Sequence, residues 1–200
     1  MTTVGFEQSR ADPCMIRKVV DGEVEMVAAH VDDILAHAKD HTTMEWFATQ
    51  LGGRFKLNDL GDAEFCSGCH VTRNRKAREL KLDQHMYVQP MAETFGVEKT
   101  RRIPAMSEAL SKGDEPQTPE EKKAVGALLC TATMTRPDTT HAVRAVARFR
   151  ENPGPAHKKV AMKIVQRLLH TMEWGITYGG QGCRLTIETY RLGFRSLLGH

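Results

Sequence analysis

AAHVDDILAH, residues 28 to 37, places two adjacent carboxylates, Asp32 and Asp33, inside an otherwise apolar stretch. Carboxylates buried in an apolar strand cost several kcal/mol each unless they have partners. At a turn between two strands, however, both side chains can stand clear of the sheet. The pair therefore indicates either a site for a divalent cation such as magnesium, which prefers oxygen ligands, or an ordinary Asp-Asp turn or helix N-cap.

The sequence around this pair predicts β structure followed by a short helix. Asp21-Gly22 is a strong turn signal between the β-branched runs at 14–20 and 24–31, which predicts a hairpin. Thr42 is a candidate N-cap with Glu45 three residues later, as in a capping box. The helix that would follow carries its apolar residues on one face and ends at Gly52-Gly53. These apolar residues are Met44, Phe47 and Leu51.

Beyond this helix, strands come first and helices follow. A second β pair is predicted at 63–71 and 78–82, and then a helix over 83–96 that bends near Pro90. Charge, Pro and Thr predict a linker at 104–120. Helices are predicted throughout 121–174, and the clearest one has an inward face at helical spacing. That face consists of Val160, Ala161, Ile164, Val165, Leu168, Leu169 and Met172. The last segments, GITYGG and CRLTIETY, look like the first strands of another β element. The fold class expected is α+β.

Composition limits the class of protein. The chain has 200 residues and a formal net charge of +3, which allows a nucleic-acid partner without requiring one. No apolar run is long enough to span a bilayer, and the first residues lack a secretion core. We therefore expect an intracellular protein that is neither secreted nor bound to a membrane. The five cysteines are odd in number and scattered, and we expect free thiols.

Eight short motifs follow one another in a fixed order. They are GFEQSRADPC (5–14), HVDDIL (30–35), FKLNDLG (55–61), KLDQHMYV (81–88), AVGALL (124–129), TRPDTTHAV (135–143), RFRENPGPAH (148–157) and GITYGG (175–180). In this order and spacing, the chain resembles the polyprotein of copia-type retrotransposons, from the reverse transcriptase palm towards the RNase H domain. The resemblance covers Gly5 to Gly180.

The resemblance implies an activity and its catalytic residues. Asp32 and Asp33 correspond to the acidic pair of the polymerase palm hairpin, which helps to hold the Mg²⁺ ions that activate the primer 3′-hydroxyl. The parent activity is RNA-directed DNA polymerisation on an RNA/DNA primer–template. His30 stands where the family usually has Tyr. The family's third carboxylate and its fingers lie upstream of GFEQSRADPC, so we expect this chain to be inactive alone and to depend on missing polyprotein segments.

The resemblance also implies a division of the chain. Residues 1–103 would be a partial palm and thumb region, 104–120 a linker, 121–174 a helical connection region, and 175–200 a truncated start of an RNase H-like domain. In the family an Asp-containing segment follows a strand like LTIETY. Here Tyr190 is followed by RLGFRSLLGH, which contains no acid, so no RNase H catalytic residue is assigned.

CSGCH at 66–70 matches the pattern for covalent haem attachment. Haem attachment requires an exported protein, so we expect no haem and instead place Cys66 and Cys69 at ordinary strand positions. Zinc bound by these two cysteines and His70, with His85 as a fourth ligand, is an alternative. That alternative lacks a second Cys/His pair at zinc-finger spacing.

Basic and aromatic residues leave further alternatives. Lys159, Lys163 and Arg167 line the polar side of the long helix and are candidate contacts for a phosphate backbone. Trp46 and Phe47 are interpreted as core residues rather than base-stacking platforms. The chain could accordingly be a nucleic-acid-binding remnant without metal chemistry, or a degenerate gene product without activity.

Overall fold

The computed structural model describes residues 5–30, 33–53, 55–100, 102, 110–113, 118–179 and 188–194. Its contacts divide the chain into two units: unit 1 is Met1–Glu64 with Gly182–His200, and unit 2 is Phe65–Gln181. Unit 2 is thus inserted, in sequence, between the two parts of unit 1. The four-part division expected from the resemblance stays a prediction.

Unit 1 is built on a six-stranded antiparallel sheet in the order β1-β2-β3-β4-β10-β5. Its strands are β1 (Glu7–Gln8), β2 (Met15–Val20), β3 (Glu23–His30), β4 (Asp33–Ala38), β5 (Leu57–Asp62) and β10 (Glu188–Phe194). Between β2 and β3, Asp21 and Gly22 both have positive φ, 51° and 81°. Two such residues make the tight turn that suits a hairpin, so the predicted hairpin is confirmed.

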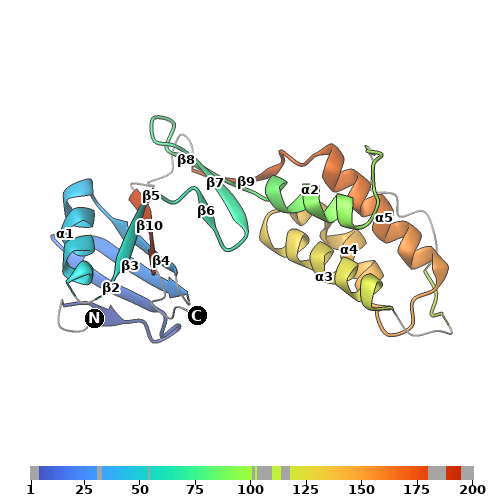
Figure 1. The fold of residues 1–200 in the computed structure, drawn as a ribbon, viewed down its shortest axis with the longest axis horizontal. Helices are drawn as coiled ribbons and strands as arrows, with labels where there is room; N and C mark the ends of the chain where they lie inside the picture. The colour runs from blue at the N-terminus through green and yellow to red at the C-terminus, as the bar shows by residue number, and fades with distance from the viewer. Residues whose placement is uncertain are drawn as a thin grey trace. The chain divides into compact units, whose positions relative to one another are not determined.

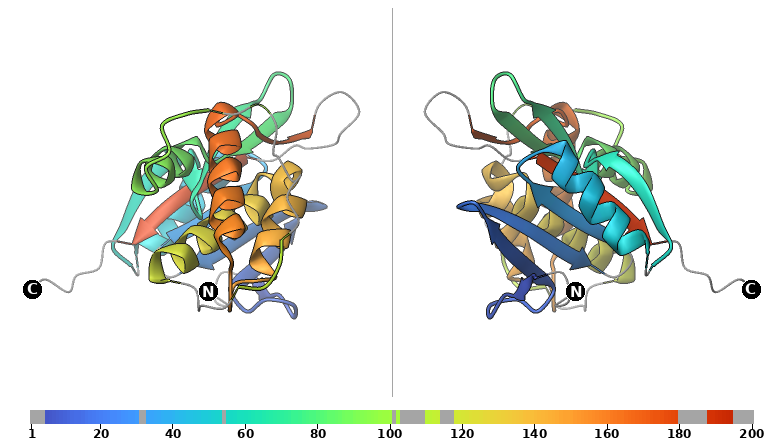
Figure 2. Two further views of the ribbon diagram at one scale, coloured as in Figure 1. Left: turned by 90° about the vertical axis from the view of Figure 1, so that its right-hand side faces the viewer. Right: turned by 90° about the vertical axis from the view of Figure 1, so that its left-hand side faces the viewer.

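Helix α1 (His41–Gly52) lies across one face of this sheet, as the right-hand view of Figure 2 shows. The expected inward face is confirmed, because Met44, Phe47 and Leu51 are buried in the core of unit 1. The prediction that Trp46 belongs to the core is wrong, since this side chain is 40% exposed. Trp46 precedes the buried Phe47 by one residue and so lies beside the buried face, where the Lys18 ammonium is 5.0 Å from the centre of its ring.

The predicted start of α1 is also wrong. Asp40, not Thr42, is the N-cap, and its carboxylate accepts hydrogen bonds from the backbone N–H (2.9 Å) and hydroxyl (2.8 Å) of Thr43. These bonds, the backbone one first, hold the pKa of Asp40 below its usual range. Glu45 therefore forms no capping box with Thr42. Its Oε1 instead lies 3.3 Å from Nε2 of His41, one helical turn earlier.

Unit 2 begins with a four-stranded antiparallel sheet in the order β6-β7-β8-β9. The strands are β6 (Phe65–Cys66), β7 (Cys69–Asn74), β8 (Glu79–Asp83) and β9 (Gly175–Gly179). Ser67 and Gly68 have positive φ, so they turn the chain between β6 and β7. The stretch 63–71, expected as one strand, is therefore a hairpin. Cys66 and Cys69 lie opposite each other in the backbone pairing of this hairpin, so both occupy strand positions.

The rest of unit 2 is a bundle of helices (Figure 1). It contains α2 (His85–Thr94), α3 (Pro119–Met134), the 3₁₀ turn η2 (Pro137–Thr139), α4 (Thr140–Ala147) and α5 (Pro155–His170). The inward face predicted for α5 is confirmed. Five residues of this face are buried in the core, and Leu169 and Met172 are partly buried and pack against it. The five are Val160, Ala161, Ile164, Val165 and Leu168. Pro90 lies inside α2, and the predicted linker falls mostly outside the described residues.

The last two strands pair with earlier ones. β9 pairs with β8 in unit 2, whereas β10 lies between β4 and β5 in unit 1. GITYGG and CRLTIETY are predicted to open another β element. GITYGG contains β9, which joins the sheet of unit 2. Most of CRLTIETY lies outside the described residues, and its last three residues begin β10 in the sheet of unit 1. The α+β class is confirmed by the antiparallel sheets and the helices. No helix in the described part of the chain is both long and apolar enough to cross a membrane.

Candidate functional site

The acidic pair lies at the junction of β3 and β4. His30 and Asp33 are the last paired residues of the two strands, so the connection consists of Val31 and Asp32. Both of these residues, and the His30 side chain, lie outside the described part. The predicted placement of the pair at a strand junction agrees with the position of Asp33, which is half-buried at the first residue of β4.

The side of the sheet that carries Asp33 follows from alternation along β4. Ile34, Ala36 and Ala38 are buried against α1. Successive residues of a strand point to opposite faces, so Asp33 belongs to the face away from α1. This placement leaves its carboxylate outside the apolar core of unit 1.

Glu25 and Glu7 are two of the other acids in this sheet, and the register places neither of them beside Asp33. Buried Glu25 neighbours Met26, which pairs with His37 on the same face as Asp33. Glu25 therefore belongs to the opposite face. Glu7 lies on the same face as Asp33, because paired residues share a face and Glu7 pairs with Arg17, which in turn pairs with Met26. However, β1 is three strands from β4, about 14 Å away at the usual strand spacing.

The donor chemistry at the hairpin suits magnesium, but the number of ligands falls short. Carboxylate oxygens are the ligands that Mg²⁺ takes up in proteins. Among the described residues, however, no cluster of three metal-ligating side chains includes Asp33. The described residues therefore do not make up a complete magnesium site by themselves.

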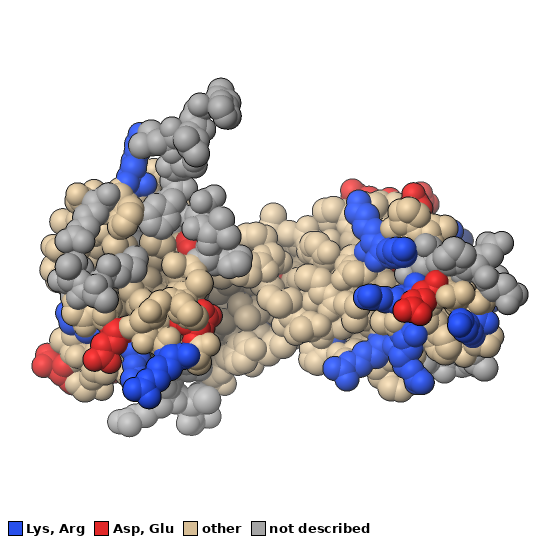
Figure 3. Space-filling model, turned by 90° about the horizontal axis from the view of Figure 1, so that it is seen from below, with Lys and Arg blue, Asp and Glu red and all other residues tan. Residues whose placement is uncertain are grey.

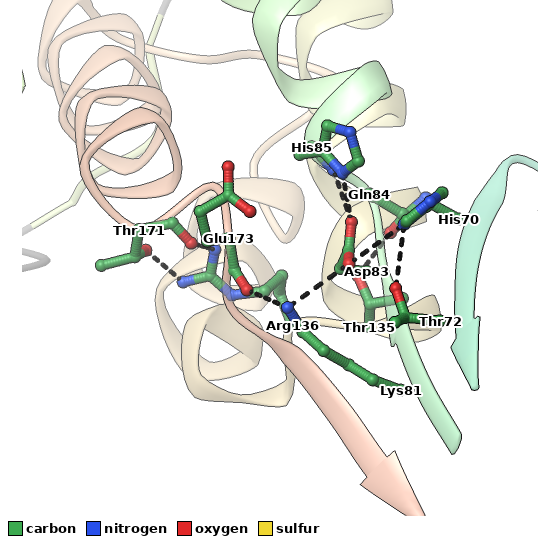
Figure 4. A network of polar contacts seen from close by, with 10 residues as sticks. All are labelled: His70, Thr72, Lys81, Asp83, Gln84, His85, Thr135, Arg136, Thr171 and Glu173. Atoms are coloured by element: carbon green, nitrogen blue, oxygen red, sulfur yellow. Dashed lines mark hydrogen bonds and ion pairs between the residues drawn. The ribbon is translucent and has the colours of Figure 1, made fainter. Parts of the chain in front are cut away.

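A second polar centre lies in unit 2, where β8 leads into α2 (Figure 4). Asp83 is almost fully buried, with its Oδ1 2.5 Å from His85 Nδ1 and its Oδ2 3.4 Å from His70 Nδ1. Lys81 Nζ lies 3.5 Å from Oδ2. Burial opposes ionisation of Asp83, but the hydrogen bonds from His85 and His70 and the charge of Lys81 outweigh it and hold its pKa below the usual range.

Two of the motifs that carry the resemblance, KLDQHMYV and TRPDTTHAV, contribute residues that meet beside this centre. The Thr135 hydroxyl donates a 2.8 Å hydrogen bond to Gln84 Oε1, and both side chains are buried. Next to Thr135, the buried guanidinium of Arg136 donates to both carboxylate oxygens of Asp138, at 2.9 and 2.8 Å. It also donates to the backbone carbonyl and the hydroxyl of Thr171 at the end of α5, at 3.0 and 2.7 Å. TRPDTTHAV and KLDQHMYV thus contribute to the packing of unit 2.

The three basic candidates on α5 differ in their surroundings. Lys159 is exposed, whereas Lys163 and Arg167 are half-buried. The Arg167 guanidinium lies 4.8 Å from the centre of the Trp174 ring and donates to the Arg102 carbonyl at 2.5 Å. Arg167 therefore takes part in packing. Figure 3 shows Lys and Arg side chains gathered on one face of unit 2.

Comparison with known families gives the decisive observation. A model of the family "Reverse transcriptase (RNA-dependent DNA polymerase)" matches residues 1–106. This match covers more than half of the chain, including the β3–β4 junction and its acidic pair. The chain belongs to the reverse transcriptase family. Together with the relatives described next, this match confirms the resemblance to copia-type retrotransposon polyproteins.

Curated relatives of this chain agree with that assignment. It is 31% identical over 193 residues to the retrovirus-related Pol polyprotein from transposon TNT 1-94 of Nicotiana tabacum. This alignment covers 90% of the chain but only 14% of the polyprotein. The chain is 23% identical to an uncharacterized mitochondrial protein of Arabidopsis thaliana, over 80% of the chain and 68% of that protein. A Saccharomyces cerevisiae protein named for transposon Ty5-1 is 24% identical, over 87% of the chain and 58% of that protein. No solved structure matches the chain.

Sequence reasoning missed the histidine–aspartate centre of unit 2. It did consider zinc at Cys66, Cys69, His70 and His85, but in the described part the metal-ligating cluster contains both histidines and neither cysteine. Asp83 was overlooked because His70 lies opposite it only through the register of β7 and β8. If the turn is placed so that Asn74 pairs with Glu79, the register follows by counting. Four residues before Asn74 and four residues after Glu79, the paired residues are His70 and Asp83.

Proposed function

We propose that this chain is the part of a retrotransposon reverse transcriptase that supplies the acidic hairpin of the polymerase palm. Asp32 and Asp33 would contribute two of the carboxylates that hold Mg²⁺ during nucleotide addition to an RNA/DNA primer–template. When bound, magnesium activates the primer 3′-hydroxyl and neutralises the phosphates of the incoming nucleotide. The observation that carries the proposal is the family match over residues 1–106, within which Asp33 begins a strand directly after the pair's other acid.

The position of Asp33 supports this role. A metal-ligating carboxylate must reach solvent and substrate, and Asp33 is half-buried on the face away from α1. The paired strands on either side of the junction hold the backbone of Asp33 in a fixed register with His30. A ligand carried by regular secondary structure is held more tightly than one carried by a long loop. The hairpin is therefore suited to presenting carboxylates to an ion.

We further propose that these 200 residues alone do not polymerise. No described acid joins Asp33 in a cluster of three metal ligands, and a two-ion site needs more oxygen ligands than one hairpin provides. The remaining ligands would come from other segments of the polyprotein, of which the chain spans 14% in the tobacco relative.

A primer-extension assay tests this proposal. Purified chain is incubated with a labelled primer on an RNA template, deoxynucleotides and either Mg²⁺ or Mn²⁺. We expect no extended primer. Extension that disappears in both Asp32→Asn and Asp33→Asn would contradict the inactivity while supporting the polymerase site. Extension that survives both substitutions would contradict the role of the acidic pair.

A second candidate function is binding of nucleic acid without metal chemistry. It is favoured by the Lys and Arg side chains gathered over unit 2 (Figure 3). Binding of an RNA–DNA hybrid would then weaken steeply with salt, because bound Lys and Arg release counterions from the phosphates. Combined replacement of Lys159 and Lys163 by Ala should reduce the slope of log affinity against log salt. Absence of binding at low salt would exclude this function.

A further inference from the structure

Three side chains that commonly bind transition metals converge where β7, β8 and α2 meet. His70 comes from β7, Asp83 ends β8, and His85 begins α2. Their ligand atoms all lie within 4.8 Å of one another. The two imidazole rings are edge to face, with centroids 4.9 Å apart. In Figure 4 both rings direct a nitrogen towards the carboxylate of Asp83.

We propose that His70, Asp83 and His85 form a zinc-binding site. Two imidazole nitrogens and one carboxylate oxygen are a usual ligand set for Zn²⁺, whereas Mg²⁺ prefers oxygen alone. Ligands about 2.0–2.1 Å from a tetrahedral zinc ion lie about 3.3 Å apart. The distance between His70 Nδ1 and Asp83 Oδ2 is 3.4 Å, so this pair already has the spacing of zinc ligands. His85 Nδ1 lies 2.5 Å from Asp83 Oδ1, so the His85 ring has to move outward when the ion binds.

The burial of the three residues gives the ion one open position. Asp83 has only 3% of its side chain exposed, while His70 and His85 have 34% and 32% exposed. Zinc can therefore enter from the side on which the two histidines are exposed to solvent. A fourth ligand, such as water, would occupy that side. Three protein ligands with one open position are typical of zinc sites that can bind a further molecule.

Lys81 is the cation that zinc would have to displace from Asp83. Its ammonium lies 3.5 Å from Asp83 Oδ2, but it also donates a 2.6 Å hydrogen bond to the backbone carbonyl of Glu173. This second partner lets Lys81 keep a hydrogen bond when zinc takes the carboxylate. Zinc would then join β7 to the β8–α2 junction, so its binding should stabilise unit 2.

X-ray absorption spectroscopy of the wild-type chain loaded with one equivalent of zinc tests the ligand set directly. Its five cysteines make the spectrum decisive, because sulfur and nitrogen ligands differ in distance, about 2.3 Å against 2.0–2.1 Å. We expect two imidazoles and oxygen. A first shell containing sulfur would overturn the proposal, because it would place zinc on thiols such as Cys66 and Cys69. Failure to bind zinc would overturn it as well.

Calorimetric zinc titration of variants identifies the residues. His70→Ala and His85→Ala should each weaken zinc binding by at least about tenfold, since even loss of a supporting residue costs that much. His170→Ala, at an exposed position at the end of α5, is the matched control and should bind zinc as the wild type does. Equal affinity in all three variants would overturn the proposal. Circular dichroism verifies that each variant is folded, and the spectroscopic test does not depend on any variant.

Discussion

Replacement of Arg136 by Met should strongly destabilise unit 2. Its side chain is 2% exposed and makes four hydrogen bonds, two to Asp138 and two to Thr171. Methionine keeps the apolar stem but removes every donor. The Thr171 carbonyl and hydroxyl oxygens then lose the donor that they share in a buried region, at the point where α5 ends, although the hydroxyl still donates to the Arg167 carbonyl.

The magnitude follows from these contacts. Hydrogen bonds from a charged donor contribute about 1.5–3 kcal/mol each. Breaking a fully buried ion pair by removing one partner costs about 3–5 kcal/mol, but Asp138 is about one-third exposed, and water will solvate its carboxylate in the variant. We therefore expect Arg136→Met to lower the free energy of unfolding by about 3 kcal/mol. Arg136→Lys should lower it by less, because the ammonium keeps the positive charge and can still bind one of the two partners, although it cannot bind both.

Urea unfolding followed by Trp174 fluorescence measures this loss. Trp174 lies beside the Arg136 guanidinium, 5.8 Å from ring centre to Cζ. A Trp46→Phe background removes the other tryptophan, which belongs to unit 1. Arg144→Met, at an exposed position on α4, is the control and should change stability by no more than about 0.5 kcal/mol. A loss in Arg136→Met no larger than in this control would refute the reasoning.

Three further predictions concern unit 2. Leu168→Ala, at a fully buried position, should cost about 3 kcal/mol in urea unfolding, and Leu169→Ala, which is only partly buried, should cost less; equal losses would contradict the packing. Thr118→Ala removes the hydroxyl that accepts the Glu121 N–H and should cost about 1 kcal/mol by thermal unfolding, whereas an unchanged melting temperature would exclude a capping role. Burial opposes ionisation of Asp138, but Arg136 outweighs it and holds the pKa of Asp138 below the usual range. Its ion pair therefore contributes stability above the unfolded pKa of about 4, and this is lost as pH falls through the folded pKa. Asp138→Asn should flatten the acid side of a stability–pH curve, and an unchanged curve would contradict this.

Local periodicity was sufficient to predict much of the fold. The buried faces of α1 and α5 followed from apolar residues at helical spacing, because each helix covers one core. Where two residues offered the same local chemistry, the sequence could not decide between them. Asp40 and Thr42 are both good N-caps, and only the packed position of the helix selects Asp40. Likewise Trp46 and Phe47 are adjacent aromatics, and the angle of α1 on the sheet decides which is buried.

The two polar centres differ in how far sequence could reach them. Asp32 and Asp33 are adjacent in the chain, so the pattern and the resemblance both pointed to them. The other centre depends on tertiary structure. His70 is thirteen residues from Asp83, and only the pairing of β7 with β8 brings them together. Such a site requires the strand register as well as the residue types, and CSGCH drew attention to the cysteines instead.

The place of β10 in its sheet has a consequence for synthesis of the chain. β4 and β5 are not neighbours, because β10 lies between them. After Asp62 leaves the ribosome, the rest of the chain through Phe194 must still emerge, which takes about 7 to 26 seconds at about 5–20 residues per second. During that time the facing edges of β4 and β5 have no partner strand, and such edges readily pair with other chains. All of unit 2 emerges within the same interval, so unit 2 can fold before unit 1 is completed.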